Sequence, residues 1–317
     1  MRVLSLLADG AWHSGAVLAE TLGVSRAAVN KQVKKAREVG VVVHSVRGRG
    51  YRLQQPFQPL NNTALLEALS AHGRSSLEAL DVLACVDSTN DYLHRTAGPG
   101  AARACFAEFQ SGGRGRRGRH WISPYGVNLY FSVAWTYQQT PAALGALSLA
   151  VGIELAEVLR AHGADVRLKW PNDLYLQHKK LGGVLIEHRG ELAGGSSIIA
   201  GVGINLGMGA DQARAIDQPW TALGEHIQMP PRNQLAAQVL DAVLRALNTF
   251  SHSGFEGYRR RWRELDLSYE KPVTLDMGDS KIHGRATGVA ADGALIVACG
   301  GHLKHFYAGE LSLRVDP

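Results

Sequence analysis

The chain has 317 residues, 45% of them hydrophobic, so it is long enough for two or three domains with buried cores and is not a disordered protein. Its three cysteines are widely spaced and form no CxxC pair, which argues against a disulfide framework and against a zinc site. The N-terminal apolar run is too short for a signal peptide and no run of about 18 apolar residues follows, so we expect a cytoplasmic protein without membrane contact.

The formal net charge of +6 is confined to one end of the chain. Residues 1–53 carry nine Lys or Arg against three Asp or Glu, whereas residues 54–317 carry 25 of each sign. A small basic module on a neutral body is typical of a DNA-binding domain attached to a domain with another function.

The basic module has the spacing of a helix-turn-helix. Ser14 is placed to cap a short helix over residues 15–22, and Ser25 is placed to cap a second helix after the turn at residues 23–25. The second helix has apolar residues at helical spacing, namely Val29, Val33 and Ala36. We therefore expect the second helix to be the recognition helix.

Candidates for contact with DNA lie on this helix and on a hairpin behind it. Three polar or cationic side chains near the start of the helix are candidates for base readout: Arg26, Asn30 and Lys31. Residues 41–43 and 51–53 are predicted strands around a basic tip with Arg47 and Arg49, which suits phosphate contact and makes the domain a winged helix. The alternative is an ordinary solvated helix and hairpin.

A proline-punctuated polar segment, residues 54–59, is the predicted linker, and a mixed domain follows it. Helical patterns cover residues 64–72, 142–162 and 232–250, and strand-like runs cover 104–109, 128–134, 166–170, 180–187 and 197–204. From Lys271 the pattern changes to short strands at 272–275, 281–287 and 294–298. We predict an α+β protein with domains at residues 1–59, 60–268 and 269–317, the last a small β-barrel.

The segment Gly113–Trp121 concentrates arginine and glycine between two predicted strands. Glycine lets backbone N–H groups converge on an anion, and the guanidinium group binds phosphate or carboxylate in bidentate fashion. The segment therefore suits a polyanion such as ATP. The alternatives are an RGG-type nucleic-acid tract and an ordinary surface loop.

Three motifs together resemble the biotin protein ligase family: Gly113–Trp121, Lys169–Leu174 (KWPNDL) and Lys180–Glu187 (KLGGVLIE). With the winged helix upstream, the chain is similar to the bifunctional subclass that is both biotin ligase and biotin operon repressor. This resemblance implies a central domain like class II aminoacyl-tRNA synthetases and an SH3-like C-terminal domain. It also implies two reactions, in which biotin and MgATP give biotinyl-5′-AMP and the adenylate then acylates one lysine of a biotin carboxyl carrier protein.

The resemblance assigns roles to particular residues. Those expected to act in the chemistry are Lys180, Arg116 and Asp173. Those expected to bind biotin are Ser88, Thr89, Asn90, Gln110, Arg114, Gly115, Arg116 and Lys180. Those expected to line the adenylate are Arg119, Trp121, Asn172, Asp173, Asn205 and Trp220. No metal-ligand set is expected in the protein itself, although Asp173 is expected to contact the metal and adenylate side and to help align or deprotonate the incoming lysine.

Structural interpretations compete with several of these roles. Lys180 also suits an exposed strand edge, Asp173 suits an Asx cap, and a Ser-Thr-Asn triplet is a common start of a helix. A tryptophan such as Trp220 is equally suited to a buried core. The end of the chain, residues 309–314, matches the family's ending, while the stretch before it diverges.

The family also implies partners and regulation. Expected partners are the biotin carboxyl carrier protein of acetyl-CoA carboxylase, operator DNA, and a second copy of the chain when the adenylate is bound, so that two winged helices reach a palindromic operator. Three other functions remain: a biotin-sensing regulator without ligase activity, a lipoyl or octanoyl transfer enzyme, and an RNA-binding protein that uses the arginine-rich loop.

Overall fold

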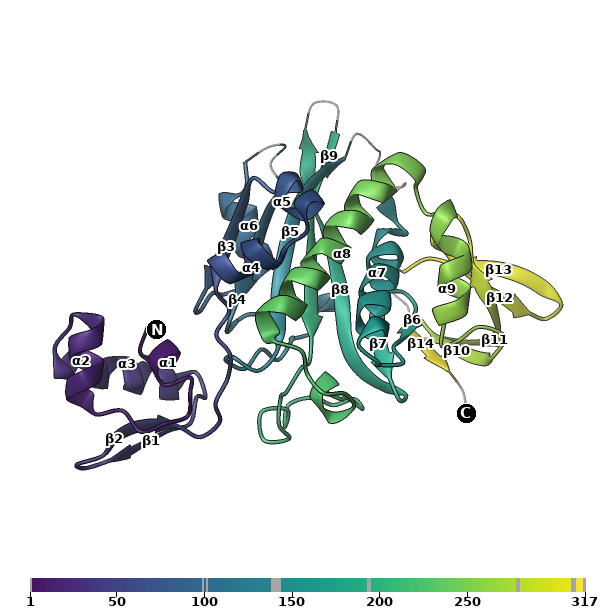
Figure 1. Ribbon diagram of the computed structural model, residues 1–317. Helices are drawn as coiled ribbons and strands as arrows, with labels where there is room; N and C mark the ends of the chain where they lie inside the picture. Colours follow the sequence, from purple (N-terminus) through teal and green to yellow (C-terminus); the bar gives the residue numbers. More distant parts are fainter. Residues whose placement is uncertain are drawn as a thin grey trace.

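The computed structural model describes residues 2–98, 100, 102–137, 144–192, 195–277, 280–308 and 312–315. Over this length the chain forms three units in sequence: a small helical unit with a hairpin, a central unit with a large sheet, and a small β unit at the C-terminal end (Figure 1). The α+β fold class predicted from the sequence is confirmed. Among the described helices, none has the length and apolar character needed to cross a membrane.

The N-terminal unit is a winged helix built on two capped helices. Its elements are α1 (Arg2–Leu6), α2 (Gly15–Leu22), α3 (Arg26–Glu38), β1 (Val43–Val46) and β2 (Gly50–Leu53). Ser14 Oγ accepts a hydrogen bond from the Val17 N–H and Ser25 Oγ accepts one from the Ala28 N–H, so both predicted caps are confirmed. Val29, Val33 and Ala36 are buried, as the helical spacing predicts. The first strand begins at Val43, the last residue of the predicted run 41–43.

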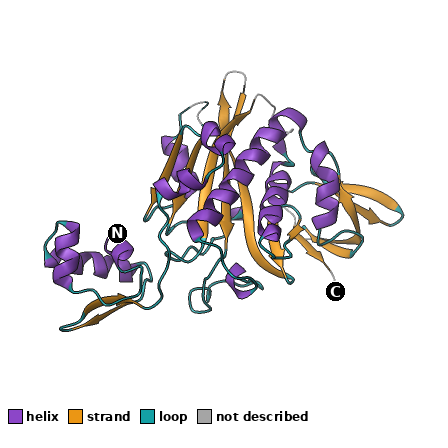
Figure 2. Cartoon of the chain, viewed as in Figure 1, coloured by secondary structure: helices purple, strands orange, loops and turns teal. Residues whose placement is uncertain are grey.

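The central unit contains a seven-stranded sheet in the order β3-β4-β5-β9-β8-β7-β6. Its strands are β3 (Ala79–Leu83), β4 (Arg103–Ala107), β5 (Leu129–Tyr137), β6 (Arg167–Lys169), β7 (Asp173–Leu176), β8 (Lys179–Leu192) and β9 (Gly195–Ile204). Only the β3 and β4 pair is parallel; the other neighbours are antiparallel. The antiparallel neighbours β8 and β9 are the long strands at the middle of the sheet (Figure 2).

The two faces of this sheet are covered unequally. The long helices α7 (Leu147–Ala161) and α8 (Arg232–Ser253) pack on one face with the main hydrophobic core, together with α4 (Asn62–Ala68) (Figure 1). The other face carries the short helix α6 (Thr89–Thr96), whose Leu93 forms a separate small core with Cys105 and Ile199. Because side chains alternate along a strand, residues that share a face with Ile199 point away from the main core.

The predicted helix over residues 64–72 is broken into two. Helix α4 ends at Ala68, and α5 (Ala71–Ser76) begins after Ser70, whose N–H and hydroxyl both donate to the Asp241 carboxylate on α8. This tertiary contact fixes Ser70 as the cap of a new helix, so the prediction of one continuous helix over residues 64–72 was wrong. The predicted helix over 142–162 begins at Leu147; Ala142 lies outside the described residues.

The C-terminal unit is a five-stranded antiparallel sheet in the order β13-β12-β11-β10-β14. Its strands are β10 (Pro272–Asp276), β11 (Lys281–Val289), β12 (Leu295–Cys299), β13 (His302–Phe306) and β14 (Ser312–Val315), and α9 (Arg259–Leu265) precedes it. Trp170 Nε1 donates to the Gly293 carbonyl at 3.0 Å, which ties this unit to the central sheet. Of the matched C-terminal stretch, Gly309, Glu310 and Leu311 lie outside the described residues.

Candidate functional site

Part of the sheet face that bears α6 has no side chains because glycines occupy it. We call this area, formed by Gly183, Gly201 and Gly203, the glycine patch. Gly183 on β8 pairs with Gly203 on β9, and Leu185 pairs with Gly201. A Cβ on Gly201 would lie 2.4 Å from Asn90 Oδ1, and a Cβ on Gly203 would lie 2.5 Å from the Trp121 ring. Glycine at these two positions therefore allows side chains from outside the sheet to lie directly on its backbone.

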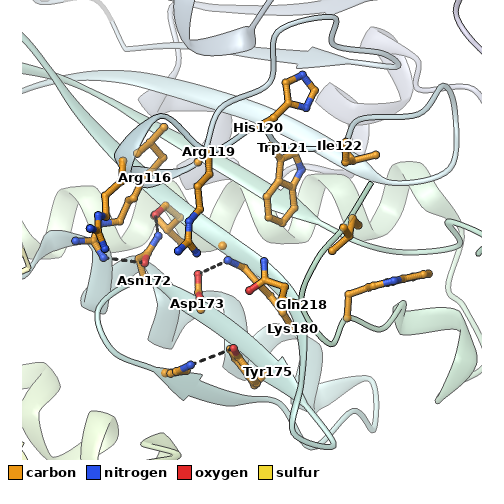
Figure 3. A pocket seen from close by; sticks show the side chains of 18 of the residues that line it. Arg116, Arg119, His120, Trp121, Ile122, Asn172, Asp173, Tyr175, Lys180 and Gln218 are labelled. Atoms are coloured by element: carbon orange, nitrogen blue, oxygen red, sulfur yellow. Dashed lines mark hydrogen bonds and ion pairs between the residues drawn. The ribbon is translucent and has the colours of Figure 1, made fainter. Parts of the chain in front are cut away.

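The arginine-glycine segment folds over the glycine patch as a tight hairpin. The Trp121 N–H donates to the Gly113 carbonyl at 2.8 Å, and the Gly115 N–H donates to the Arg119 carbonyl at 2.7 Å. Arg117 and Gly118 have positive φ angles of 59° and 69°, which turn the chain back on itself. The turn leaves Arg116 and Arg119 directed toward the next strands (Figure 3).

A cavity of about 500 Å³ lies between this hairpin, the sheet and the segment after β9. Nine of the residues selected from the sequence line it: Gly115, Arg116, Arg119, Trp121, Asn172, Asp173, Lys180, Asn205 and Trp220. Residues that the sequence reasoning did not select also line it, among them Arg117, Lys169, Tyr175, Asp217, Gln218 and Leu313. The three quoted motifs therefore meet at one cavity.

Lys180 and Asp173 form an ion pair at the wall of the cavity. Lys180 Nζ lies 2.8 Å from Asp173 Oδ1, with side chains 15% and 20% exposed (Figure 3). The two residues come from neighbouring strands, since Asp173 begins β7 and Lys180 lies near the start of β8. Asp173 therefore does not act as a simple turn cap, and Lys180 is not an exposed edge lysine.

A short parallel bridge places Trp220 beside Lys180. The Lys180 N–H donates to the Pro219 carbonyl and the Thr221 N–H donates to the Lys180 carbonyl, both at 3.0 Å. Asn205 Nδ2 donates to the Thr221 carbonyl at 3.2 Å, which fixes the same segment from β9. The indole of Trp220 is half-buried at the cavity rather than in a core.

Asn172 connects the hairpin to the sheet. Its amide Nδ2 donates to the Val184 carbonyl at 2.7 Å, and its Oδ1 accepts a hydrogen bond from Arg116 Nη1 at 3.4 Å. Burial lowers the pKa of Arg116, and the Asp173 carboxylate opposes that shift. The Arg116 guanidinium is thus held over the cavity by a neutral amide, without a carboxylate at ion-pair distance among the described residues.

The other biotin-binding candidates lie beside the cavity in a buried network of their own. Thr89 donates to Gln110 Oε1 through its N–H at 2.9 Å and through its hydroxyl at 3.1 Å. Ser132 Oγ donates to Asn90 Oδ1, and Asn90 Nδ2 donates to Glu187 Oε2 at 2.7 Å. Ser88 caps α6, so the structural interpretation of the triplet also holds.

Arg114 is turned away from the cavity toward two carboxylates. Its Nη2 lies 2.7 Å from Asp91 Oδ1 and 3.3 Å from Glu187 Oε1. The hydrogen bonds from Arg114 lower the pKa of Asp91, so this pair is fully charged near neutral pH. Arg114 is therefore neutralised by protein groups in this structure, whereas Arg116 is not.

Trp121 lies next to the buried network, on the glycine patch. Gly201 and Gly203 are two residues apart on one strand face, so Asn90 and Trp121 cover neighbouring positions. Trp121 Nε1 is buried and has no hydrogen-bond partner among the described residues. Lys180 Nζ lies 5.7 Å from the Trp121 ring centroid, within the range of a cation–π contact. An unsatisfied indole donor thus lies over Gly203, beside the cavity and the network.

The cavity is strongly cationic. Five Arg or Lys residues line it, Arg116, Arg117, Arg119, Lys169 and Lys180, against two carboxylates, Asp173 and Asp217. Burial lowers the pKa of Lys169, which lies 5.2 Å from the Tyr175 ring centroid and donates to Tyr175 Oη at 3.3 Å. The described residues contain no cluster of three or more His, Cys, Asp or Glu that would hold a metal ion without help from a ligand.

The candidates for DNA contact lie on α3 and on the wing. Arg26, Asn30 and Lys31 are exposed on the first turns of α3, and Arg47 and Arg49 are exposed at the tip between β1 and β2. Asn30 Nδ2 donates to Tyr51 Oη on β2 at 3.3 Å, which ties the recognition helix to the wing.

Comparison with known proteins places the chain in a family. Residues 82–205 match the model of the biotin/lipoate A/B protein ligase family, residues 2–52 match an HTH domain, and residues 270–314 match the biotin protein ligase C terminal domain. The chain belongs to the biotin protein ligase family.

Within that family, the chain is similar over almost its full length to proteins described as bifunctional ligase/repressor BirA. It is 44% identical over 316 residues to the protein of Escherichia coli K12, covering 99% of this chain and 97% of the relative. It is 27% identical over 315 residues to that of Bacillus subtilis 168. Among solved structures, the biotin protein ligase from Aquifex aeolicus in complex with biotin and ATP matches with a TM-score of 0.64 at 30% identity, covering 76% of this chain and all of that one.

Proposed function

We propose that the chain is an ATP-dependent biotin protein ligase. It forms biotinyl-5′-AMP and transfers the biotinyl group to a lysine of the biotin carboxyl carrier protein of acetyl-CoA carboxylase. The observation that carries this proposal is the cavity with five cations and the Lys180–Asp173 pair, in a chain related over its full length to bifunctional ligase/repressors.

The first reaction needs several negative charges to be held together. A carboxylate oxygen of biotin attacks the α-phosphorus of ATP, and the bond from that phosphorus to the bridging oxygen breaks, so pyrophosphate leaves with the electron pair. Arg116 and Lys180 are the cations proposed to stabilise the transition state, since electrostatic stabilisation at a preorganised site is the main contribution a protein makes to such a step. Arg119, Trp121, Asn172, Asn205 and Trp220 are proposed to surround the adenylate.

Magnesium is proposed to enter with ATP. Mg²⁺ in nucleotide sites is usually held by one or two carboxylates together with substrate phosphates. Asp173 and Asp217 are the carboxylates that line the cavity, so the donor set fits a phosphate-borne ion rather than a site built by the protein alone. When bound, the ion would neutralise phosphate charge.

The second reaction moves the acyl group from phosphate to nitrogen. The carrier lysine amine attacks the biotinyl carbonyl carbon, the carbon–oxygen bond to the phosphate breaks, AMP leaves with the electron pair, and the new amide nitrogen releases one proton to water. A lysine has an ordinary pKa near 10.4, so it must lose a proton before it attacks. Asp173 is proposed to align this amine and accept that proton, while Lys180 holds the phosphate that departs.

Biotin is proposed to lie on the glycine patch. Its ureido group would exchange hydrogen bonds with Thr89, Asn90 and Gln110, and Ser88 would keep this segment in place as the cap of α6. The buried indole donor of Trp121 supports a ligand at this place. Arg114 and Gly115 are proposed to close the hairpin over the ligand.

Transfer of labelled biotin to a purified carrier domain with MgATP tests the ligase. Wild type is expected to label the carrier, Lys180→Ala and Arg116→Ala are expected to lose most of this activity, and Lys179→Ala is expected to keep it because Lys179 is exposed beside the site. Biotin binding without any transfer by wild type would instead favour a biotin-sensing regulator without ligase activity. Stabilisation by lipoate rather than biotin in thermal melts would favour lipoyl transfer.

We further propose that the same adenylate makes the chain a repressor of biotin biosynthesis genes. The winged helix would bind an operator half-site, with Arg26, Asn30 and Lys31 in the major groove and Arg47 and Arg49 on phosphates. A sheet edge of the central unit is the surface proposed for a homodimer; β3 is the edge strand that fits, because the opposite edge strand β6 is already bridged to Asp266. Sedimentation with biotin and ATP, compared with neither, would show whether the dimer depends on adenylate.

The compartment proposed for these activities is the cytoplasm. Cys85, Cys105 and Cys299 are free thiols in the structure, and free thiols persist in a reducing compartment. A fusion to a fluorescent protein, imaged in cells, would test this placement.

A further inference from the structure

The base of the wing contains a third strand-like segment that the helix-turn-helix pattern did not reveal. The His13 N–H donates to the Tyr51 carbonyl at 2.9 Å, and the Tyr51 N–H donates to the His13 carbonyl at 2.8 Å. Gly50 has φ +100°, and a Cβ there would lie 2.0 Å from the His13 carbonyl oxygen. Only glycine permits this close approach, so the segment before α2 is fixed against the wing.

This arrangement brings two arginines to one indole. The guanidinium carbon of Arg49 lies 5.0 Å from the centroid of the Trp12 ring, and that of Arg52 lies 5.1 Å from it. Both distances are within the range of a cation–π contact. The ring keeps the two guanidinium groups close to each other. Because their like charges repel, an anion that binds between them would stabilise the pair.

The protein supplies little negative charge to this pair. In the described part of residues 2–53, the one ion pair is that of His13 with Asp9 at 3.0 Å. Arg52 Nε is buried without a hydrogen-bond partner among the described residues, and Arg49 is exposed. Because no described carboxylate pairs with either guanidinium group, the charge of both is available to an anionic ligand from outside the chain.

The position of the pair indicates which anion this is. Tyr51, the neighbour of Arg52 on β2, accepts the hydrogen bond from Asn30 on the exposed side of α3, so wing and recognition helix form one connected surface. The exposed cations of α3, Arg26, Lys31, Lys34 and Lys35, have no ion pair among the described residues either. Duplex DNA is the ligand whose phosphates repeat along such a surface.

We propose that Trp12, Arg49 and Arg52 form a phosphate clamp for duplex DNA, in which Trp12 is the positioning residue and the two guanidinium groups bind the backbone. This inference rests on the proposed DNA-binding function and adds Trp12 and Arg52 to it. Phosphate contacts position a protein on DNA without reading its sequence, so the clamp acts on any duplex.

The salt dependence of DNA binding tests the clamp. The full chain is titrated against a fluorescently labelled duplex of generic sequence at several salt concentrations, and the slope of log affinity against log salt counts the phosphate contacts. Arg52→Gln removes one charge and is expected to reduce that slope by about 1. Trp12→Ala removes no charge, yet it is expected to reduce the slope as well and to weaken binding about tenfold at low salt, because both guanidinium groups lose their support.

Two further variants separate positioning from a general structural effect. Trp12→Phe keeps an aromatic face and is expected to retain most of the wild-type slope, while Val46→Ala changes an exposed wing residue outside the clamp and is expected to match wild type. Thermal melts of every variant check that the domain remains folded. An unchanged slope in both Trp12→Ala and Arg52→Gln, with Lys31→Ala still weakening binding, would overturn the clamp and leave the DNA-binding function intact. Absence of duplex binding by wild type would overturn both.

Discussion

Lys169 is one of two cations of the cavity, with Arg117, that the sequence did not lead us to select. Its ammonium group lies against Tyr175, and burial lowers its pKa while Asp173 opposes the shift. Burial raises the pKa of Tyr175 to about 12, so the phenol stays neutral near pH 7 and gives no counter-charge. Lys169 also has no ion pair within 4 Å among the described residues, unlike Lys180.

We predict that Lys169 serves the first reaction more than the second. ATP brings a triphosphate, whereas the adenylate keeps one phosphate, so an additional cation matters most while pyrophosphate is bound. Lys169→Met is expected to slow biotin-dependent exchange of pyrophosphate into ATP about 10- to 100-fold, or about 1.4–2.7 kcal/mol. Transfer from chemically made biotinyl-5′-AMP to the carrier is expected to change little. Equal losses in both assays would contradict this division.

Gly203 carries a second prediction at this scale. A Cβ there would lie 2.5 Å from the Trp121 ring, too close for the ring to stay in place, whereas a Cβ on Gly207 would lie 3.6 Å from its nearest neighbour. Gly203→Ala is therefore expected to displace Trp121, weaken biotin binding in calorimetry and cost about 1–3 kcal/mol of overpacking in urea unfolding. Gly207→Ala is the matched control, and equal behaviour of the two variants would count against the patch.

Part of the site was predictable residue by residue. Lys180, Asp173 and Arg116 meet at the cavity because motifs fix residue types at short spacing. Lys169 was missed, although it pairs with Asp173 across the β6–β7 turn and so faces the same side. The direction of Arg114 was not predictable, because Asp91 lies 23 residues away and Glu187 lies 73 away. The sequence shows that Arg114 is charged, but which carboxylates it pairs with depends on the tertiary fold.

At the level of elements, the start of α8 holds the linker. Arg232 Nη1 lies 2.7 Å from Glu108 Oε2, with both side chains almost fully buried, and Nη2 donates to the Asn128 carbonyl at 2.7 Å. The Leu60 N–H donates to Glu108 Oε1 at 2.6 Å. One buried ion pair thus joins three parts of the chain: the end of the linker, the end of β4 and the start of α8.

Breaking this pair from one side is expected to be costly. Arg232→Met leaves Glu108 buried without its cation and is expected to lower the free energy of unfolding by about 3–5 kcal/mol. Arg245→Met is the control, because Arg245 is half exposed and its partner Glu154 keeps a second arginine, Arg261, at 2.8 Å; its effect is expected to stay within about 1 kcal/mol. Urea denaturation of both variants measures the difference, and similar midpoints would contradict it.

Elements with local signals were predicted well, and those set by distant contacts were not. Ser14 and Ser25 mark helix starts by their own side chains. The break before α5 depends on Asp241 from α8, which no local pattern contains. Strand β13 was not predicted, because four of its five residues, His302–His305, are exposed and carry no core-facing alternation. The long strand β8 was predicted only over its apolar part.

At the scale of the whole molecule, one short segment, residues 121–125, connects the hairpin over the cavity to the linker before the central unit. Trp121 closes the hairpin, Ser123 Oγ donates to the Trp121 carbonyl and accepts from Gln110 Nε2, and Tyr125 lies two residues further along the chain. Tyr125 is buried against the winged-helix core and packs edge-on against Phe57 of the linker at 5.7 Å. A change at the cavity therefore has a direct path of packed groups to the DNA-binding unit.

We predict that Tyr125 couples ligand binding to DNA binding. Adenylate can raise DNA affinity only if it favours one arrangement of the winged helix over others, and a coupling of this kind is commonly about 1–3 kcal/mol. Tyr125→Ala and Phe57→Ala remove the contact that carries it, while the residues lining the cavity stay in place. Both variants are expected to keep biotin transfer and to lose most of the gain in duplex affinity that biotin and ATP give wild type.

The measurement is a DNA titration with and without biotin and ATP, run beside the carrier assay on the same preparations. Tyr307→Ala is the control, since Tyr307 is an exposed aromatic residue on the C-terminal unit and contacts Asp292 there. Because coupling is reciprocal, DNA must also tighten adenylate binding in wild type by the same factor, and this second factor must fall in the two variants. An undiminished ligand response in Tyr125→Ala would mean that the coupling runs through the dimer rather than through the linker.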